Sequence, residues 1–171
     1  MELSYTIRPA RIEDALIIVR QRRRMFEDMG YSDYIQSEGV DAAYLEWVKP
    51  RLLDGRCRHW LVQYAGEIVG GGGIEIHERA PHPVGLATHY AHVVGVYIEP
   101  EHRRQGLARQ LMLTALAFCR ESGLNFVTLQ ASDFGRPLYE SLGFEASSEM
   151  RLLMRDVHPL QERLPHEYPD D

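Results

Sequence analysis

Apolar residues in the first third of the chain recur at the three- and four-residue spacing that is typical of amphipathic helices. One such run covers Glu13–Met29 and is followed by Gly30, a residue type that commonly ends a helix. A second run covers Val40–Leu53, contains Pro50 and is followed by Gly55. The pattern therefore predicts two consecutive helices, and the second of them is expected to be interrupted at the proline.

The middle of the chain predicts strands, because apolar and polar residues alternate there. The stretches 59–64 and 67–79 flank the pair Ala65-Gly66, which predicts a hairpin turn. The second stretch contains Gly70–Gly73, and no helix follows these four glycines. They therefore indicate close backbone packing or a bulge rather than a phosphate-binding loop. His89–Ile98 is the most strand-like stretch of the sequence.

The second half of the chain has the spacing of a strand–helix–strand unit. After the strand at His89–Ile98, the pattern predicts a helix at Leu107–Glu121 and a strand at Asn125–Ala131. Units of this kind form right-handed crossovers between parallel strands. A short helix at Pro137–Ser141 and further strands over Phe144–Met154 are expected to follow.

The order of elements predicts a mixed sheet with helices on its faces, preceded by a short strand at Tyr5–Arg8 that Pro9 stops. At 171 residues, the chain is long enough for one domain with a substantial core. We expect that domain to span residues 1–157. The tail 158–171 carries three prolines and is expected to be extended or disordered.

Composition and charge exclude several classes of function. The net charge of −6 argues against a broad surface for nucleic acid or for anionic membranes. Neither a signal sequence nor an apolar run of about 18 residues is present, so a cytoplasmic protein is expected. The eight histidines are scattered without a ligand-like cluster, and no metal is expected. Of the two cysteines, Cys119 is predicted to be a buried free thiol.

The stretch EPEHRRQGLARQLM, Glu99–Met112, leads into the longest predicted helix of this half without a Ser, Thr, Asp or Asn cap. Arg103 and Arg104 instead place positive charge beside the first free amides of the helix, which is where an anion binds. Gly106 allows the backbone to approach a ligand closely, and Ala108 keeps the next turn slim. The stretch therefore predicts a phosphate site, although it matches neither a Walker A loop nor GxGxxG.

With this pattern, Arg-x-x-Gly-x-Ala, the sequence resembles the GNAT superfamily of acyl-CoA-dependent N-acyltransferases. A second pattern of that family, Asn-x-x-Ala-x-x-Leu-Tyr-x-x-x-Gly-Phe, resembles the stretch SDFGRPLYESLGF, residues 132–144. The Leu, Tyr, Gly and Phe positions match, whereas Ser132 replaces the Asn and Gly135 replaces the Ala. The opening IRPARIEDA is also similar, and the resemblance covers roughly residues 5 to 155.

The resemblance implies a GNAT fold. In it, a central mixed, mostly antiparallel, twisted sheet carries helices on both faces, and one parallel strand–helix–strand crossover forms the acyl-CoA cleft. Acetyl-CoA is implied as cosubstrate, with its diphosphate on the amides before the long helix and its pantetheine arm along one strand edge. The implied cofactor-binding residues are Val96, Tyr97, Ile98, Arg103, Arg104, Gln105, Gly106, Leu107, Ala108 and Ser132.

Direct acyl transfer to an amine requires a donor for the thioester oxygen, an acid for the leaving thiolate and a base for the amine. A bulge at Gly95 would free a backbone N–H for the oxygen. Tyr139 matches the family's tyrosine acid, or it merely packs in the core. His92 stands where one branch of the family has its glutamate base, and it is alternatively a hydrogen-bonded core residue. A water chain or Glu75 are the other candidates for the base.

The acceptor is expected to be a primary amine of a small molecule or peptide, but its identity stays open. The acids Glu27, Asp28, Asp33 and Glu38 near the expected cleft would favour a cationic amine. Arg20 and Arg22–Arg24 would instead bind an acceptor carboxylate or pair with those acids. The alternative function is a non-catalytic acyl-CoA sensor or partner-binding module on the same fold. A homodimer is possible, since dimers are common in the family.

Overall fold

The computed structural model describes residues 4–31, 39–81, 83 and 86–151. Its elements are β1 (Thr6–Pro9), η1 (Ile12–Asp14), α1 (Ala15–Asp28), α3 (Val40–Asp54), β2 (Cys57–Tyr64), β3 (Glu67–Glu78), β4 (His89–Ile98), η2 (Pro100–His102), α4 (Leu107–Glu121), β5 (Val127–Leu129) and α5 (Arg136–Ser141). The expected tail at 158–171 lies outside the described residues. Most helices and strands fall within two residues of their predicted bounds.

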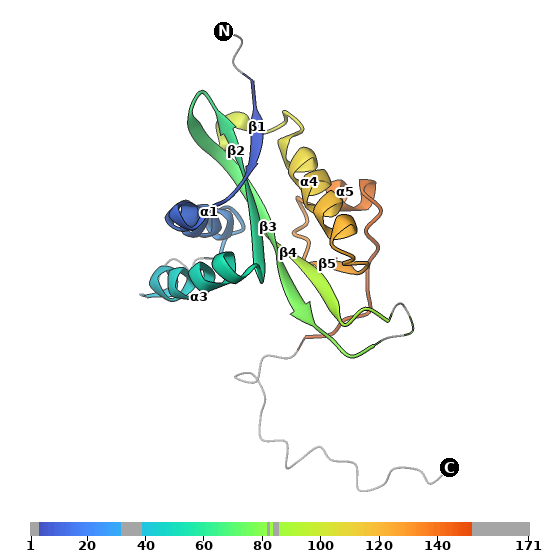
Figure 1. Cartoon of the computed structure of the whole chain (residues 1–171). Coiled ribbons are helices and arrows are strands. Elements are labelled where there is room, and N and C mark those ends of the chain that lie inside the picture. Colours follow the sequence, from blue (N-terminus) through green and yellow to red (C-terminus); the bar gives the residue numbers. More distant parts are fainter. Residues whose placement is uncertain (1–3, 32–38, 82, 84–85, 152–171) are drawn as a thin grey trace, which may run out of the picture.

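The five strands form one sheet in the order β1-β2-β3-β4-β5 (Figure 1). The first four strands pair antiparallel, and β4 pairs parallel with β5. The parallel pair is joined through α4, so the predicted mixed, mostly antiparallel sheet with one crossover is confirmed.

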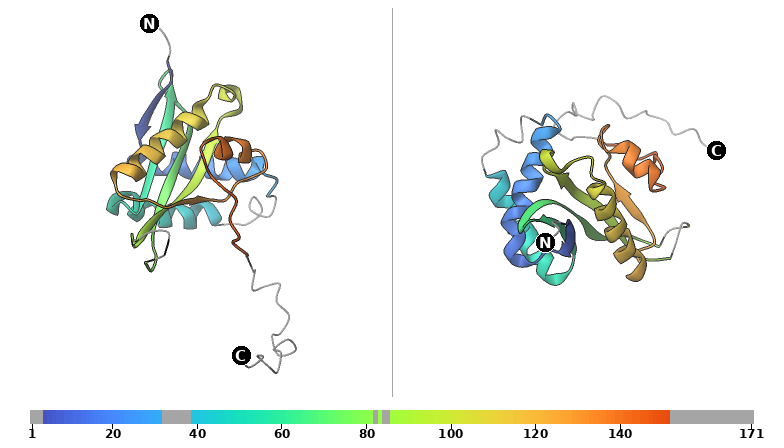
Figure 2. Two further views of the ribbon diagram at one scale, coloured as in Figure 1. Left: turned by 90° about the vertical axis from the view of Figure 1, so that its right-hand side faces the viewer. Right: turned by 90° about the horizontal axis from the view of Figure 1, so that it is seen from above.

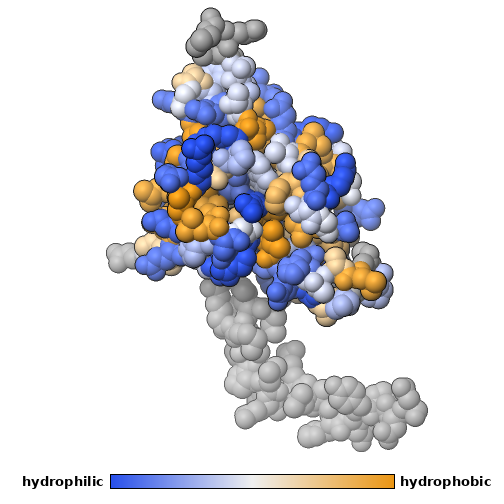
Figure 3. All heavy atoms as spheres, viewed as in Figure 1, coloured by the Kyte–Doolittle hydropathy of each residue, from blue (hydrophilic) through white to orange (hydrophobic). Residues whose placement is uncertain are grey.

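The helices cover both faces of the sheet. Figure 1 and the two views of Figure 2 show α1 and α3 on one face, with α4 and α5 on the other. On the face shown in Figure 3, hydrophobic residues form separate patches among hydrophilic ones. No helix within the described ranges is both long enough and apolar enough to cross a membrane.

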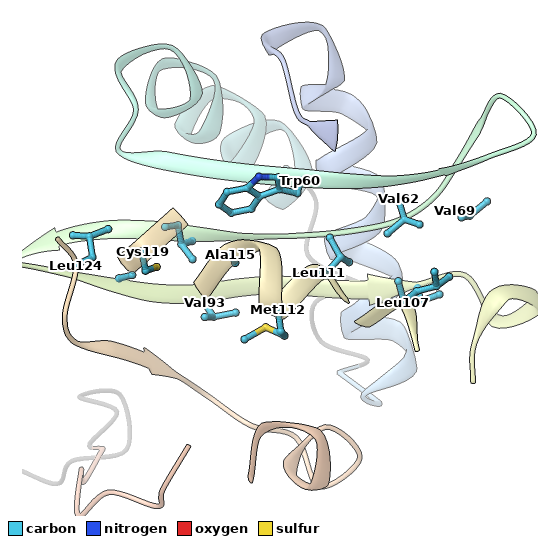
Figure 4. Packing of buried hydrophobic residues seen from close by; sticks show 13 residues of the cluster. Trp60, Val62, Val69, Val93, Leu107, Leu111, Met112, Ala115, Cys119 and Leu124 are labelled. Carbon is cyan, nitrogen blue, oxygen red and sulfur yellow. The ribbon is translucent and has the colours of Figure 1, made fainter. Parts of the chain in front are cut away.

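The larger core lies between the sheet and α4 (Figure 4). Trp60 and Val62 of β2 meet Leu111 and Met112 of α4, all of them buried. Full burial of one such apolar side chain stabilises the fold by about 1.5–3 kcal/mol. This packing fixes α4 on the sheet and thereby sets its N-terminus beside the end of β4. Cys119 is a buried free thiol of the same core, as predicted.

The centre of β3 carries four glycines because neighbouring side chains occupy the space above it. A Cβ atom on Gly71 would overlap the amide of Gln21 in α1, and one on Gly73 would overlap the ring of His59 in β2. On the opposite face, the side chain of Ile98 takes the space beside Gly70. The prediction of close backbone packing is therefore confirmed.

Three details of the sequence-based prediction are wrong. No strand follows Phe144 within the described residues up to 151, where residues 145–151 are exposed, and the last three positions of the predicted stretch, 152–154, lie outside the described residues. Pro50 does not interrupt α3. It lies on an exposed face, where water can satisfy the one carbonyl that loses its bond. Pro9 belongs to β1, and an edge strand tolerates proline.

Candidate active site

β4 and β5 pair over only part of the length of β4. Their register runs from Ala91–Val127 to Val93–Leu129, whereas β4 continues to Ile98. Beyond Val93, the edge of β4 that faces β5 therefore has no strand partner among the described residues. This opening, which we call the seam, is bounded by β4 on one side and by the chain that leaves β5 on the other. The residues Val96, Tyr97 and Ile98, predicted to hold the pantetheine arm, lie along it.

β4 contains a bulge within the seam. Gly71 of β3 pairs with Tyr97, and Gly73 pairs with Val94, so Gly95 and Val96 share the space opposite one residue of β3. Gly95 has φ +64°, the left-handed conformation that the first residue of this kind of bulge requires. The predicted bulge is confirmed. A bulge leaves its extra residue outside the ladder, and its amide can then serve another acceptor.

The loop between β4 and α4, residues 99–106, delivers the chain to the helix start in an unusual conformation. Arg104 has φ +64° and Gly106 has φ +76°, and both residues are exposed. No side chain caps α4, and its first helical bond runs from the Gln110 amide to the Gly106 carbonyl, at 3.1 Å. The amides of the first turn therefore have no acceptor within the helix, and together with the helix dipole they favour an anion.

The residues predicted to bind the diphosphate differ in whether the side chain or only the backbone amide is accessible to a ligand. Gln105 is exposed, as is Arg104, so the charge of Arg104 is accessible. Leu107 is buried and Ala108 is half-buried in the core beneath α4, so only their backbone amides can serve a ligand. Burial of these two side chains is what holds the amides in place.

Arg103 is directed away from the helix start. Its Nε donates to the carbonyl oxygen of Ile98 at 2.8 Å, and its guanidinium pairs with the carboxylate of Asp28 on α1. The guanidinium also lies over the ring of Tyr97, 5.6 Å from the ring centroid. Nearby carboxylate charge raises the pKa of Arg103 despite the opposing effect of burial, which is the largest single influence. The side chain thus contacts α1, and its charge is not directed to the anion site at the amides of α4.

Ser132 and Tyr139 lie on the segment that follows β5. The Ser132 hydroxyl accepts from the Gly135 amide at 3.2 Å, and its carbonyl accepts from the same amide and from Arg136. This turn starts α5, which packs Tyr139 against the α4 side of the core with its ring 6.0 Å from that of Phe144. Burial raises the pKa of Tyr139. Its hydroxyl has no hydrogen-bond partner among the described residues.

A row of polar residues crosses three strands at one register level. Glu75 of β3 is paired with His92 of β4, which is paired with Thr128 of β5. His92 Nδ1 lies 2.8 Å from the Thr128 hydroxyl, and Glu75 lies 3.1 Å from the Nε2 atom of His77. Burial lowers the pKa of His92, although the charge of Glu75 acts in the opposite direction. The imidazole is therefore neutral at physiological pH, and Nε2 is the nitrogen that Thr128 leaves accessible.

The charged residues near α1 mostly pair with one another. Arg24 binds Glu99 at 2.5 Å and Arg23 binds Asp41 at 2.6 Å, while Asp28 binds Arg103. Arg22 lies over the ring of Tyr44, and Arg20 and Glu27 are exposed. Asp33 and Glu38 lie outside the described residues. Arg23 and Arg24 thus pair with acids, but with Asp41 and Glu99 rather than with Glu27 or Asp28 of the predicted set.

Sequence reasoning missed two participants, Thr128 and Glu99. Thr128 becomes a neighbour of His92 only through the parallel pairing, and its position in the middle of a predicted strand beside β4 was the available signal. Glu99 accepts from both Arg24 and Tyr97. No signal in the sequence pairs it with α1. Among the residues described here, no group of three His, Cys, Asp or Glu is placed to hold a metal ion.

Comparison with known sequences finds acetyltransferases. Residues 20–144 match the family described as Acetyltransferase (GNAT) family. An E. coli K12 protein, the uncharacterized N-acetyltransferase YjgM, is 35% identical over 121 residues, which are 69% of this chain and 65% of that protein. The glucosamine 6-phosphate N-acetyltransferase of Trypanosoma brucei brucei is 30% identical over 145 residues, 79% of this chain and 97% of that protein. The chain thus spans just under two thirds of the E. coli relative.

Solved structures share the fold. A GCN5-related N-acetyltransferase from Ralstonia eutropha JMP134 has a TM-score of 0.84 at 30% identity, over 89% of this chain and 99% of that one. An acetyltransferase of Clostridium acetobutylicum, solved with acetyl-CoA, has a TM-score of 0.80 at 22% identity, over 94% and 99%. The chain therefore shares its fold with a protein that was solved with acetyl-CoA.

Proposed function

The chain belongs to the acetyltransferase (GNAT) family, and from this premise we propose that it transfers an acetyl group from acetyl-CoA to a primary amine by direct transfer in a ternary complex. The observation that carries the proposal is the seam. It combines an unpaired edge of β4, a bulge at Gly95 and the free amides at the start of α4. These features match a molecule whose diphosphate would bind the amides of α4 and whose amide-bearing arm would lie along the edge of β4.

The residues that would hold acetyl-CoA follow from this match. The diphosphate would accept from the backbone amides of Gly106, Leu107 and Ala108, with the exposed Arg104 adding positive charge. The amides of the pantetheine arm would pair with the edge of β4 from Val96 to Ile98, in the manner of an added strand. Ser132 would border the arm from the β5 side, at the turn that starts α5.

The bulge at Gly95 would supply the hydrogen-bond donor that the reaction needs. When the amine nitrogen attacks the thioester carbonyl carbon, negative charge develops on the carbonyl oxygen, and an amide at the bulge is the donor that would stabilise it. The C–S bond then breaks as the carbonyl re-forms. The departing thiolate would take its proton from the hydroxyl of Tyr139, whose raised pKa keeps it protonated near neutral pH.

The amine must lose a proton in the same sequence, and His92 is the proposed acceptor of that proton. Its Nδ1 is engaged by Thr128, so Nε2 would receive the proton directly or through one water. Glu75 lies at the same register level and would stabilise the resulting imidazolium. The amine acceptor is proposed to be a small molecule or a peptide, in line with a relative that is named for glucosamine 6-phosphate.

The test is thiol release from acetyl-CoA across a panel of sugar amines, polyamines, amino acids and peptides, with mass spectrometry of the products. We expect release that depends on the acceptor and product heavier by one acetyl group. Arg104→Ala should weaken CoA binding, and Gln110→Ala on the first turn beyond the amides is its matched control. CoA binding without any acceptor-dependent release would support the alternative, a non-catalytic sensor. Failure to bind CoA would refute both functions.

A further inference from the structure

Two ion pairs connect α1 to the loop at residues 99–106. Arg24 binds Glu99 at 2.5 Å, and Asp28 binds Arg103. Arg24 and Asp28 are four residues apart in α1 and therefore share one helix face. Their charges are opposite, and so are those of Glu99 and Arg103. Along the chain, the helix therefore carries a positive and then a negative group, and the loop carries a negative and then a positive group.

Tyr97 lies at the centre of this arrangement. Its hydroxyl donates to Glu99 at 3.1 Å, and its ring is the surface on which the guanidinium of Arg103 rests. Tyr97 itself is buried, with 6% of its surface exposed. Burial and the neighbouring carboxylate of Glu99 both raise the pKa of Tyr97, so the phenol stays a donor. Each ion pair therefore includes one residue, Glu99 or Arg103, that also contacts the buried side chain of Tyr97.

Arg103 makes three different contacts through its side chain. The Nε atom donates to Ile98, the terminal nitrogen pairs with Asp28, and the planar face contacts Tyr97. Its backbone amide donates to Pro100 at 3.3 Å. Arg104, the next residue, has the left-handed backbone conformation that turns the chain toward α4. A non-glycine residue held there costs free energy, so neighbouring contacts must maintain it.

We infer that Asp28 is a positioning residue for the cofactor site: by holding Arg103 against α1, it fixes the loop so that the amides at the start of α4 face a diphosphate. The inference rests on the proposed function, because it assigns that diphosphate to CoA. It also gives Arg103 a different role from that of a direct phosphate ligand. The loop depends on a helix of the opposite sheet face for its shape.

The competing interpretation predicts the opposite sign. If Arg103 left Asp28 to bind the diphosphate, the carboxylate would compete with CoA, and removing its charge would tighten binding. If Asp28 positions Arg103, removing its charge loosens the loop and weakens binding. CoA affinity in one neutral variant therefore separates the two roles.

The experiment measures CoA binding by calorimetry on the full chain, comparing wild type with Asp28→Asn, Asp28→Glu and Asp41→Asn. We expect Asp28→Asn to raise the Kd about fivefold, the factor that corresponds to about 1 kcal/mol, the upper range for an exposed ion pair. Asp28→Glu should restore most of the affinity. Asp41→Asn breaks the Arg23–Asp41 pair elsewhere on α1 with the same change in charge, and should leave the Kd within a factor of two.

A double-mutant cycle with Arg103→Gln makes the test specific. We expect Asp28→Asn to add less than twofold in the Arg103→Gln background, because both changes remove one contact. With an acceptor in hand, the KM for acetyl-CoA should rise in Asp28→Asn while kcat changes less than twofold. Tighter or unchanged CoA binding in Asp28→Asn, or an equal loss without Arg103, overturns the inference. Wild-type chain that binds no CoA overturns the proposed function instead.

Discussion

The Nδ1 atom of His92 and the hydroxyl oxygen of Thr128 lie 2.8 Å apart across the parallel pair of β4 and β5. This contact fixes the orientation of the imidazole ring and leaves Nε2 as the nitrogen that can exchange a proton with a substrate. It also lies where the two strands are still paired, just before the seam opens. The proposed base is thereby attached to the rigid part of the site.

The pH dependence of activity tests His92. Because burial lowers its pKa below the ordinary 6.5, the neutral base should be fully available above that value, and kcat/KM should fall only at more acidic pH. We expect His92→Gln to lower kcat/KM by roughly 100-fold and to remove this acidic limb. His89→Gln, an exposed histidine of the same strand, is the control. An unchanged profile in His92→Gln would assign the proton to a water chain or to Glu75.

Removal of one hydroxyl tests Tyr139. Tyr139→Phe should lower kcat by on the order of 100-fold, because the thiolate loses its proton donor, and should leave the Kd for CoA unchanged. Since burial raises the pKa of the phenol, wild-type activity should not decline through loss of this proton until the pH exceeds about 10. Stopped-flow thiol release and calorimetry measure the two quantities. Turnover equal to that of wild type would show that the ring only packs against the core.

Two glycine-to-alanine changes separate catalysis from packing. Gly95→Ala has room for its Cβ, 3.6 Å from the His59 ring, but φ +64° costs about 1–2 kcal/mol and favours loss of the bulge. Gly73→Ala has no such φ, but its Cβ would overlap His59, at a cost of about 1–3 kcal/mol. We expect Gly95→Ala to lose most of its turnover, more than its loss of stability explains. Gly73→Ala should chiefly lose stability. Urea titrations and turnover measure both; parallel losses in the two variants would contradict the assigned role of the bulge.

The stability of the fold should depend on pH through His59. This side chain is 4% exposed, and burial lowers its pKa to about 4, whereas the unfolded chain titrates near 6.5. Between these values the unfolded state binds more protons, so stability is complete above pH 6.5 and is lost as the pH falls toward 4, by roughly 3 kcal/mol. His59→Met should show a flatter dependence over that window in denaturant titrations at several pH values. Equal slopes for both proteins would show that His59 is not the titrating group.

The elements from β2 to α4 were predictable because their signals are local. Alternation marks β2 and β3, the pair Ala65-Gly66 marks their turn, and Gly106 and Gly123 flank the apolar run of α4. The bulge was predictable for the same reason, since Gly95 stands between two valines in the middle of the strand. The strands expected after Phe144 failed because a mixed polar segment gives no periodicity from which burial can be inferred.

The side-chain partners were not predictable, because they depend on contacts between distant parts of the chain. Arg103 and Asp28 are 75 positions apart, and nothing near either residue indicates the other. The motif that contains Arg103 predicts a phosphate contact, whereas in the folded chain its guanidinium pairs with the carboxylate of Asp28. The burial of His59 likewise depends on Gly73, which offers the ring its space only once β2 and β3 are paired.

The seam makes the sheet incomplete in a way that an exchangeable molecule can correct. Between Val93 and Ile98, one side of β4 keeps backbone groups that no described strand takes up. A ligand bound along them would act as a removable strand. The same hydrogen bonds would then contribute both to the affinity for the ligand and to the stability of the fold. Each release of product would then remove those hydrogen bonds from the edge of β4 and lower the stability of the protein again.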